Sequence, residues 1–433
     1  MSQDTGTLPP TFDRADGHAV FPQTDHDETA RMNFLTGLNV HIGRTLSPGV
    51  RTTYEQRVKP AYEKANGAAP SSATDIRKAM LLDPNYQQWA ALRRNTQETS
   101  QQASREIALR RVDTLSAEAD ALNDGRNTLS LDDNLTIPSY QAAVDNHLMP
   151  GSYYTEAVDG DVTAAATYEI SLFPIGGASF GAKGDGGGRA MANFVRDRFP
   201  DLNPKRIVDM GGGIGGNTLP LAAAFPDAEI IVVDTAAPML RYGHARAQSM
   251  GYGNVSFVQG LAETVDLEPG SIDLIVSVMF WHETSTKTVS EALAHMHSLL
   301  APGGVMLHLE QPNFDAATPT FERFMRDWDA YYNNEPFWPK LHTLDMFQAM
   351  EDAGFDKENL FDAGTEADTE LAAEIPGPVG GGEGFNAARD DQGDRVSMHS
   401  GVISQDDGLV TSDLTGQHRF DNPVVRVLIE RTL

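Results

Sequence analysis

The sequence of 433 residues contains no cysteine, which excludes disulfide bonds and thiolate metal ligands. No stretch approaches the roughly 20 apolar residues that a membrane-spanning helix needs. The first residues, MSQDTGTLPP, lack the basic start and the apolar segment of a secretory signal peptide. The lack of a membrane span and of a signal peptide predicts a cytoplasmic protein that does not enter a membrane, whereas the lack of cysteine says little about compartment.

Basic residues are scarce: 33 Lys and Arg stand against 61 Asp and Glu, a formal net charge of -28. Such a surface repels nucleic acid phosphates and anionic lipids. We therefore expect neither nucleic acid nor a membrane surface as a partner. With 40% hydrophobic residues the chain can still bury a large core, and its length favours two or more structural units.

The first third of the chain is helical in pattern. Residues 1–24 are polar and rich in proline, which predicts a flexible tail. Residues 25–125 show helical periodicity, and Asp83 with Pro84 forms an N-cap and first-turn pair. The polar stretch 95–104 favours a face toward solvent or another subunit. We therefore predict a helical domain at 25–125 that can dimerise, and a homodimer as the assembly.

Residues 126–190 form an irregular connecting region. It contains the glycine-rich stretch FPIGGASFGAKGDGGG just before a predicted helix. These glycines can either wrap a ligand or serve as a flexible connector, and the pattern does not separate the two.

Strand-like and helical segments alternate from residue 191 onward. The apolar segments RIVDM, EIIVVD, SIDLIVSVMF and GVMLHLE are separated by helical stretches, which predicts an α/β fold with a doubly wound, mostly parallel sheet. Two later segments, NLFDAG and VVRVLIERTL, are expected to pair as an antiparallel hairpin that closes the sheet. The domain would span 191–433, with an insertion at about 365–422 that caps the active site.

The turn after the first of these strands is rich in glycine. Asp209 ends the strand, and glycines follow at 211, 212, 213, 215 and 216, where main chain can approach a ligand at the start of a helix. Asp234 ends the next strand, where a carboxylate can bind both hydroxyls of a ribose. The loop alone fits a dinucleotide as well as S-adenosylmethionine.

The segment from Asp209 to Gly215 resembles the first motif, (D/E)-x-G-x-G-x-G, of the class I S-adenosylmethionine-dependent methyltransferases. Asp209, Gly211, Gly213 and Gly215 match it one for one, and the resemblance covers about 190–365 and the last ten residues. It implies a Rossmann-like sheet with an antiparallel last strand and S-adenosylmethionine as cofactor. It also implies that Gly211 and Gly213 pass beneath the methionine moiety and that Asp234 holds the ribose.

The family often places an acid after the third strand to recognise adenine. Here Leu261 stands at that position, so the resemblance leaves Ala262 and Glu263 as the adenine neighbours.

Two ionisable residues end adjacent predicted strands. His282 follows VSVMFW and Glu310 ends GVMLHLE. The carboxyl ends of parallel strands meet at one edge of a sheet, so His282 and Glu310 can act as a base and the group that orients it. Glu283 is either their helper or a charge that opens the next helix. The bland alternative for His282 is a histidine that caps a strand.

The placement of this pair resembles that of the catalytic residues in small-molecule O-methyltransferases of the caffeate and hydroxyindole type. His282 stands in place of their general base and Glu310 in place of their glutamate, while Glu283 and Thr284 replace the usual Asp and Trp. The resemblance implies methyl transfer to a hydroxyl oxygen of a small-molecule acceptor. A methyltransferase acting on nitrogen, sulfur or carbon, or a noncatalytic ligand-binding scaffold, remains an alternative.

The aromatic segment 321–343 completes the predicted site. Its first rings, Phe321, Phe324 and Trp328, are expected in a core. A set of later residues can wall an acceptor pocket: Tyr332, Asn333, Asn334, Glu335 and Trp338. Because no histidine spacing typical of a metal site occurs, no metal is predicted.

Overall fold

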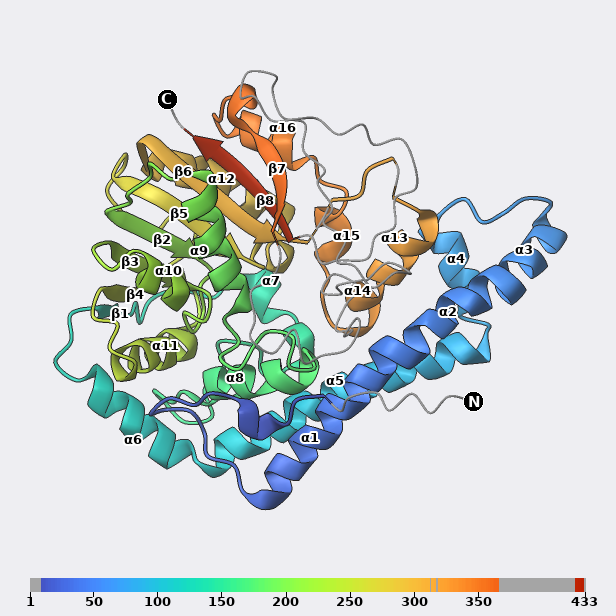
Figure 1. Cartoon of the computed structure of the whole chain (residues 1–433), viewed down its shortest axis with the longest axis horizontal. Helices are drawn as coiled ribbons and strands as arrows, with labels where there is room; N and C mark the ends of the chain where they lie inside the picture. Colours follow the sequence, from blue (N-terminus) through green and yellow to red (C-terminus); the bar gives the residue numbers. More distant parts are fainter. Residues whose placement is uncertain (1–8, 312, 317, 366–424, 432–433) are drawn as a thin grey trace.

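The computed structural model describes residues 9–311, 313–316, 318–365 and 425–431 (Figure 1). Its N-terminal part is helical: η1 (Phe12–Arg14), α1 (His26–His41), η2 (Ile42–Leu46), α2 (Ser47–Thr53), η3 (Tyr54–Val58), α3 (Lys59–Asn66), α4 (Ala73–Met80), α5 (Pro84–Arg110) and α6 (Val112–Asn123). The next segment contains β1 (Leu129–Ser130), α7 (Ser139–Ala142), η4 (Asn146–Leu148) and α8 (Thr163–Ile175).

The remaining elements alternate as predicted. They are α9 (Gly186–Arg198), β2 (Arg206–Met210), α10 (Thr218–Ala224), β3 (Glu229–Asp234), α11 (Ala237–Ser249), β4 (Val255–Gln259), β5 (Ile272–Val278), η5 (Trp281–Glu283), α12 (Thr286–Leu299), β6 (Leu300–Glu310), α13 (Thr320–Arg326), α14 (Trp328–Tyr332), α15 (Trp338–Leu341), α16 (Met346–Asp352), η6 (Lys357–Asn359), β7 (Phe361–Thr365) and β8 (Val425–Arg431).

These strands form one eight-stranded sheet in the order β1-β4-β3-β2-β5-β6-β8-β7. The first six are mutually parallel, and β8 is antiparallel to both β6 and β7. The predicted α/β fold class and its antiparallel closing strand are therefore confirmed. The two-residue strand β1, which adds an edge beside β4, was not predicted.

Helices cover both faces of the sheet. One buried cluster joins the strands to α9 and α10 and includes Met191, Leu221 and Leu274. The other joins them to α12 and α16 and includes Met296 and Met350. Strands buried on both faces read as continuous apolar runs, which is why the sequence showed them clearly.

The helical part packs directly on the sheet domain: α6 and α8 contact α11, and α5 packs along α8 (Figure 1). The polar stretch of α5, expected to face solvent or a second subunit, is buried on one side: Ser100 and Ser104 have no exposed surface and Gln101 only 2%, whereas Asn95, Thr99 and Gln102 are exposed. Ser100 donates its hydroxyl to the Thr96 carbonyl at 2.8 Å, one turn earlier. A hydroxyl satisfied within its own helix can be buried, and its small size allows a close helix contact.

The expected flexible tail is also packed, from residue 9 onward. Phe12 and Val20 are buried, and the Phe12 ring lies edge-on to Phe173 of α8 at 5.5 Å. The His18 Nε2 atom is 2.9 Å from Glu169 Oε2. This segment therefore contributes to the core around α8 instead of extending into solvent.

The aromatic helices α13 and α14 pack against the N-terminal helices. Phe321, Phe324 and Trp328 are buried with Tyr86 and Trp89 of α5, so the prediction that these rings fill a core is confirmed. In the part of the chain described, no helix has both the length and the apolar character of a membrane span. The predicted capping insertion at 365–422 lies outside the described residues, apart from Thr365 in β7.

Candidate functional site

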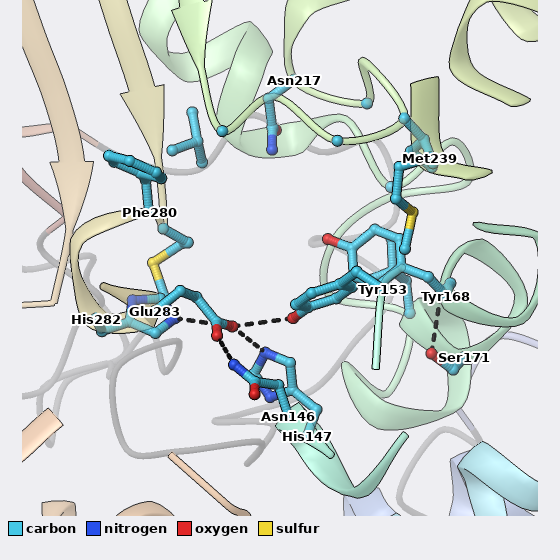
Figure 2. Close-up of a pocket in the computed structure, with 18 of the residues that line it drawn as sticks. Asn146, His147, Tyr153, Tyr168, Ser171, Asn217, Met239, Phe280, His282 and Glu283 are labelled. Atoms are coloured by element: carbon cyan, nitrogen blue, oxygen red, sulfur yellow. Dashed lines mark hydrogen bonds and ion pairs between the residues drawn. The ribbon is translucent and has the colours of Figure 1, made fainter. Parts of the chain in front are cut away.

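A cavity of about 320 Å³ lies at the carboxyl edge of the sheet (Figure 2). The glycine loop after β2 lines one side, η5 a second, and the segment from η4 to α8 a third. Residues of α5 complete it, among them Gln97 and Gln101. The expected ligand edge of a parallel sheet is therefore a hollow that several distant segments enclose.

The glycine loop presents main chain to this cavity. Gly211, Gly212, Gly213 and Gly216 line it, whereas Gly215 does not. Gly211 has φ 73°, and a Cβ atom there would lie 2.3 Å from the Phe280 ring, so only glycine fits. The loop thus needs glycine at 211 both for its backbone conformation and for contact with the end of β5.

Two carboxylates hold the loop. Asp234 accepts hydrogen bonds from the Gly213 and Ala236 backbone N–H groups, each at 2.9 Å. Asp209 accepts a hydrogen bond from the Thr218 hydroxyl at 2.5 Å, while its Oδ1 atom has no partner among the described residues. Burial raises the pKa of Asp209 to about 7. Both carboxylates line the cavity.

Only one of the two predicted adenine neighbours lines the cavity. Ala262 lines the cavity next to Gly260, whereas Glu263 does not. The orphaned Asp209 oxygen, the exposed glycine backbone and the Asp234 carboxylate fit the sugar and amino acid parts of S-adenosylmethionine, which carry hydrogen-bond donors.

Strand β5 ends earlier than predicted, at Val278, and a sharp turn follows. Met279 has φ 54°, a left-handed conformation that non-glycine residues rarely adopt, and η5 carries His282 into the cavity. The His282 Nδ1 atom lies 2.7 Å from Glu310 Oε1. Glu310 Oε2 accepts the Trp281 backbone N–H at 2.7 Å. The structure thus brings together the two residues predicted as base and orienter.

The Glu310 carboxylate fixes the state of this imidazole. Nδ1 donates to the carboxylate, so Nε2 is the nitrogen directed toward Glu283, 3.9 Å from its Oε1. Burial alone would lower the pKa of His282, but the charge and hydrogen bond of Glu310 outweigh it and raise this pKa to about 9.

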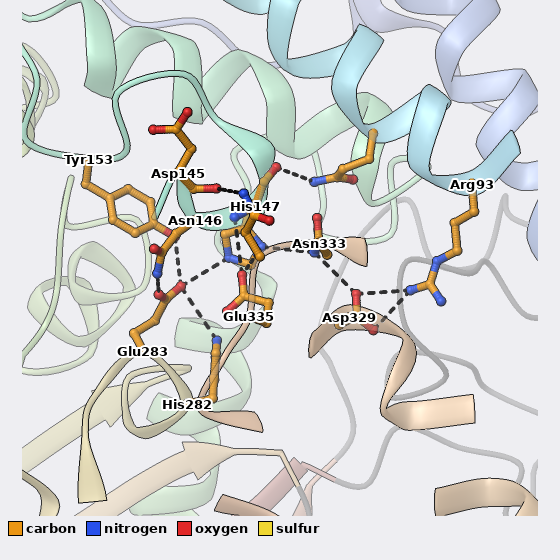
Figure 3. A network of polar contacts seen from close by, with 12 residues as sticks. Arg93, Asp145, Asn146, His147, Tyr153, His282, Glu283, Asp329, Asn333 and Glu335 are labelled. Atoms are coloured by element: carbon orange, nitrogen blue, oxygen red, sulfur yellow. Dashed lines mark hydrogen bonds and ion pairs between the residues drawn. The ribbon is translucent and has the colours of Figure 1, made fainter. Parts of the chain in front are cut away.

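Glu283 is held by a loop that the sequence did not single out. Its carboxylate accepts hydrogen bonds from the Tyr153 hydroxyl at 2.9 Å and from the Asn146 amide, and His147 Nε2 lies 3.2 Å away. On the other side of the His147 ring, Nδ1 lies 2.8 Å from Glu335 Oε1 (Figure 3). Glu283 therefore belongs to a polar cluster and does not act only as the first charge of α12.

Opposing effects set the charges of this cluster. Burial favours the neutral forms, but the carboxylates of Glu335 and Glu283 raise the pKa of His147 well above its usual value. The pKa of Glu283 is lowered because the hydrogen bond and charge of His147 outweigh burial. Glu335 is fully buried, and burial raises its pKa to about 6.

The predicted acceptor residues divide as well. Asn333 and Trp338 line the cavity, and the Trp338 ring lies 5.0 Å from the His282 ring. Tyr332 packs on Trp328 within the aromatic cluster, and Asn334 donates to the Asp145 carbonyl at 3.0 Å; neither lines the cavity. Tyr153 and Tyr168, aromatic residues that lie within the irregular connecting region, occupy the wall instead.

Comparison with known proteins agrees with this geometry. Residues 207–304 match a family described as "Methyltransferase domain". They contain β2 to β5, the glycine loop, Asp234 and His282, within a sheet of the order and direction given above. This part of the chain is a class I S-adenosylmethionine-dependent methyltransferase domain. The predicted family, and with it S-adenosylmethionine as cofactor, is confirmed.

Individual relatives match over part of their length. The chain is 30% identical over 158 residues to the ubiquinone/menaquinone biosynthesis C-methyltransferase UbiE of Psychromonas ingrahamii, covering 36% of this chain and 59% of that protein. It is 35% identical over 119 residues to the malonyl-[acyl-carrier protein] O-methyltransferase of Methylococcus capsulatus, covering 27% of this chain and 40% of that protein. The chain thus spans about half the length of the curated relatives it matches.

Solved structures to which this chain is similar include the Haemonchus contortus phosphoethanolamine N-methyltransferase 2 in complex with S-adenosyl-L-methionine. It is 18% identical, with a TM-score of 0.37, and the match covers 45% of this chain and 43% of that one.

Proposed function

We propose that the protein transfers a methyl group from S-adenosylmethionine to a hydroxyl oxygen of a small molecule, with His282 as general base. One observation carries this proposal: His282 lines the cavity that the glycine loop and Asp234 also line, and the buried Glu310 carboxylate holds its ring at 2.7 Å. The base and the cofactor loop therefore face the same enclosed space.

The residues of the chain divide the work. Gly211, Gly213 and Asp234 would hold the cofactor, which supplies a positively charged sulfonium and a reactive methyl group. Trp338 and Asn333 would position the acceptor beside His282. Nε2 of His282 would remove the hydroxyl proton, while Glu310 holds the ring and stabilises its charged form. Positioning supplies much of the acceleration, and a base adds roughly 10²- to 10⁴-fold.

Glu310 has a consequence for this mechanism. With its pKa at about 9, His282 is mostly protonated at neutral pH in the free protein, and only the neutral ring can accept a proton. A positive charge bound nearby lowers such a pKa. We therefore expect the base form to increase when the cavity holds a cationic ligand, and the rate to rise with pH.

A methyl-transfer assay tests the proposal. Labelled S-adenosylmethionine is offered with a panel of phenols, thiols and amines, and cofactor binding is measured separately by calorimetry. His282→Ala should lose roughly 10²- to 10⁴-fold in turnover and keep cofactor affinity. His26→Ala, whose side chain is 94% exposed, is the matched control. An unchanged turnover number in His282→Ala would discard the base assignment.

A carbon acceptor is the second candidate, because a relative is named a C-methyltransferase. Product analysis by NMR separates an O-methyl from a C-methyl group. If the methylated atom is carbon, nitrogen or sulfur, His282 would bind the acceptor and would not act as its base. A cytoplasmic location and a homodimer also belong to the proposal, and light scattering after gel filtration checks the latter.

A further inference from the structure

The cluster beside His282 contains imidazole and carboxylate groups from three separate segments. His147 comes from η4, Glu283 from η5, and Glu335 from the loop between α14 and α15. With His282, they offer four ligand atoms that all lie within 4.8 Å of one another. Figure 3 shows the His282, Glu283 and Glu335 side chains gathered around the His147 ring. We propose that His147, Glu283 and Glu335 bind a divalent transition-metal ion beside the proposed base.

The spacing is close to that of a metal site. Ligand atoms bound to one ion at about 2.0–2.2 Å lie no more than about 4.4 Å apart, so the set needs to contract by only a few tenths of an ångström. Imidazole nitrogen favours zinc, iron or copper, and carboxylate oxygen favours magnesium or manganese. The mixed set fits Mn²⁺, Fe²⁺ or Zn²⁺. The chain has no thiolate to compete for such an ion.

Unpaired oxygen atoms provide independent support. Glu335 has no exposed surface, and its Oε2 atom has no partner among the described residues. The Oδ1 atom of Asn146, which lines the cavity and is 3% exposed, likewise has none. The Asn146 amide orientation is fixed because its nitrogen donates to Glu283. A buried oxygen without a partner costs about 1–3 kcal/mol, and a bound cation would remove that cost.

The backbone is strained where each segment supplies its ligand. His147 itself has φ 53°, Asn334 next to Glu335 has φ 56°, and Met279, shortly before Glu283, has φ 54°. Non-glycine residues in this region cost of order 1–3 kcal/mol each and concentrate at functional sites. The strain persists because other bonds enforce it: Gln97 donates to the His147 carbonyl at 3.1 Å.

The groups around the ligands also suit a metal. Tyr153 and Asn146 donate to Glu283 and fix its carboxylate, as outer-shell partners do in metal sites. In the part of the chain described, the cationic partners of Glu283 and Glu335 are histidines, with no lysine or arginine paired to either. An ion there would hold the acceptor oxygen next to His282. That catalytic reading rests on the proposed function, whereas ion binding itself does not.

Metal binding can be measured without any activity. The untagged protein is stripped with a chelator, dialysed against Mn²⁺ or Zn²⁺ separately, and its metal content determined by mass spectrometry. We expect one tightly bound ion per chain, and at least ~100-fold weaker binding in His147→Ala and in Glu335→Gln. Glu268→Gln, an exposed site, and His26→Ala are the matched controls.

Each outcome decides a different proposal. If the wild-type protein binds no more metal than the His147→Ala variant, hydrogen bonds and ion pairs alone hold the cluster together, and the proposed metal site is wrong. This comparison holds even if Glu335→Gln does not fold. If His282→Ala keeps the ion but loses methyl transfer, both proposals stand. If His282→Ala loses the ion as well, the site stands with His282 as a ligand, and the base assignment falls.

Discussion

The Nδ1 atom of His282 lies 2.7 Å from the Oε1 atom of Glu310, although 28 positions separate the two residues in the chain. The contact exists because β5 and β6 are parallel neighbours whose carboxyl ends meet. Glu310 also accepts the backbone N–H of Trp281, so one carboxylate fixes both the ring and the turn that carries it.

Replacing Glu310 by glutamine should shift the pH dependence of turnover. The carboxylate raises the pKa of His282 to about 9, so its removal should bring the midpoint of the rate profile down toward 6.5. The neutral ring would then be available at lower pH, but it would be a weaker and less well oriented base, and the plateau should fall at least ~10-fold. Turnover measured from pH 6 to 10 checks this. The same midpoint in wild type and Glu310→Gln would rule out the pair as the titrating unit.

Asp234→Ala should weaken cofactor binding. The carboxylate is a charge-assisted acceptor in the cavity and the partner of the Gly213 N–H, and loss of such a bond costs about 1.5–3 kcal/mol. Affinity for S-adenosylhomocysteine should therefore fall roughly 10- to 100-fold in calorimetry. Asp227→Ala, on the exposed turn before β3, is the control. Equal affinities would remove Asp234 from the cofactor site.

Gly211→Ala should destabilise the fold through a specific clash. The new Cβ would meet the Phe280 ring at 2.3 Å, in addition to the cost of φ 73°. Gly251→Ala separates the two effects, because Gly251 has φ 84° but no neighbouring atom within 4 Å. Backbone strain alone should lower the free energy of unfolding of Gly251→Ala by about 1 kcal/mol. The clash should lower that of Gly211→Ala by roughly 1–3 kcal/mol more. Urea unfolding measures both. Equal losses would mean that the Phe280 ring moves aside without cost.

Glu169→Gln should destabilise the junction between the N-terminal segment and the sheet domain. Glu169 pairs with His18 and with Arg246, whose side chain is 2% exposed, and a buried charge left without its partner costs about 3–5 kcal/mol. Although burial opposes it, the charges of His18 and Arg246 lower the pKa of Glu169 to about 2. Its contribution is therefore present above pH 4.5 and is lost as the pH falls toward about 2.

Urea unfolding at pH 7 and at pH 3 tests this prediction. The difference between wild type and Glu169→Gln should shrink at pH 3. Glu106→Gln, in an exposed pair with Arg31, should change stability by less than about 1 kcal/mol. A small loss at pH 7, similar to that of Glu106→Gln, would contradict the role given to Glu169.

The sequence predicted the parts of the site that follow regular strands. Asp209, Asp234, His282 and Glu310 each stand at or just beyond the end of a buried strand, and the parallel sheet brings such ends to one edge. The glycine spacing identified the cofactor loop for a related reason, since its backbone conformation and its contact with Phe280 restrict position 211 to glycine.

Contacts between distant irregular segments could not be predicted in this way. His147 sits in a one-turn η4 helix with a left-handed backbone, and no periodicity places it opposite Glu283 or Glu335. The burial of Ser100 was missed for another reason. Its hydroxyl is satisfied by its own helix, so a polar residue was mistaken for a solvent-facing one.

The place of β8 in the sheet has a consequence for how the chain folds. β7 contacts the sheet through β8, which lies between it and β6 but follows it in the chain after the segment 366–424. During synthesis, one edge of β6 therefore stays unpaired until residues 425–431 leave the ribosome. An unpaired strand edge is a template for aggregation. Nascent chains stalled before residue 425 should accordingly depend on chaperones far more than the completed protein does.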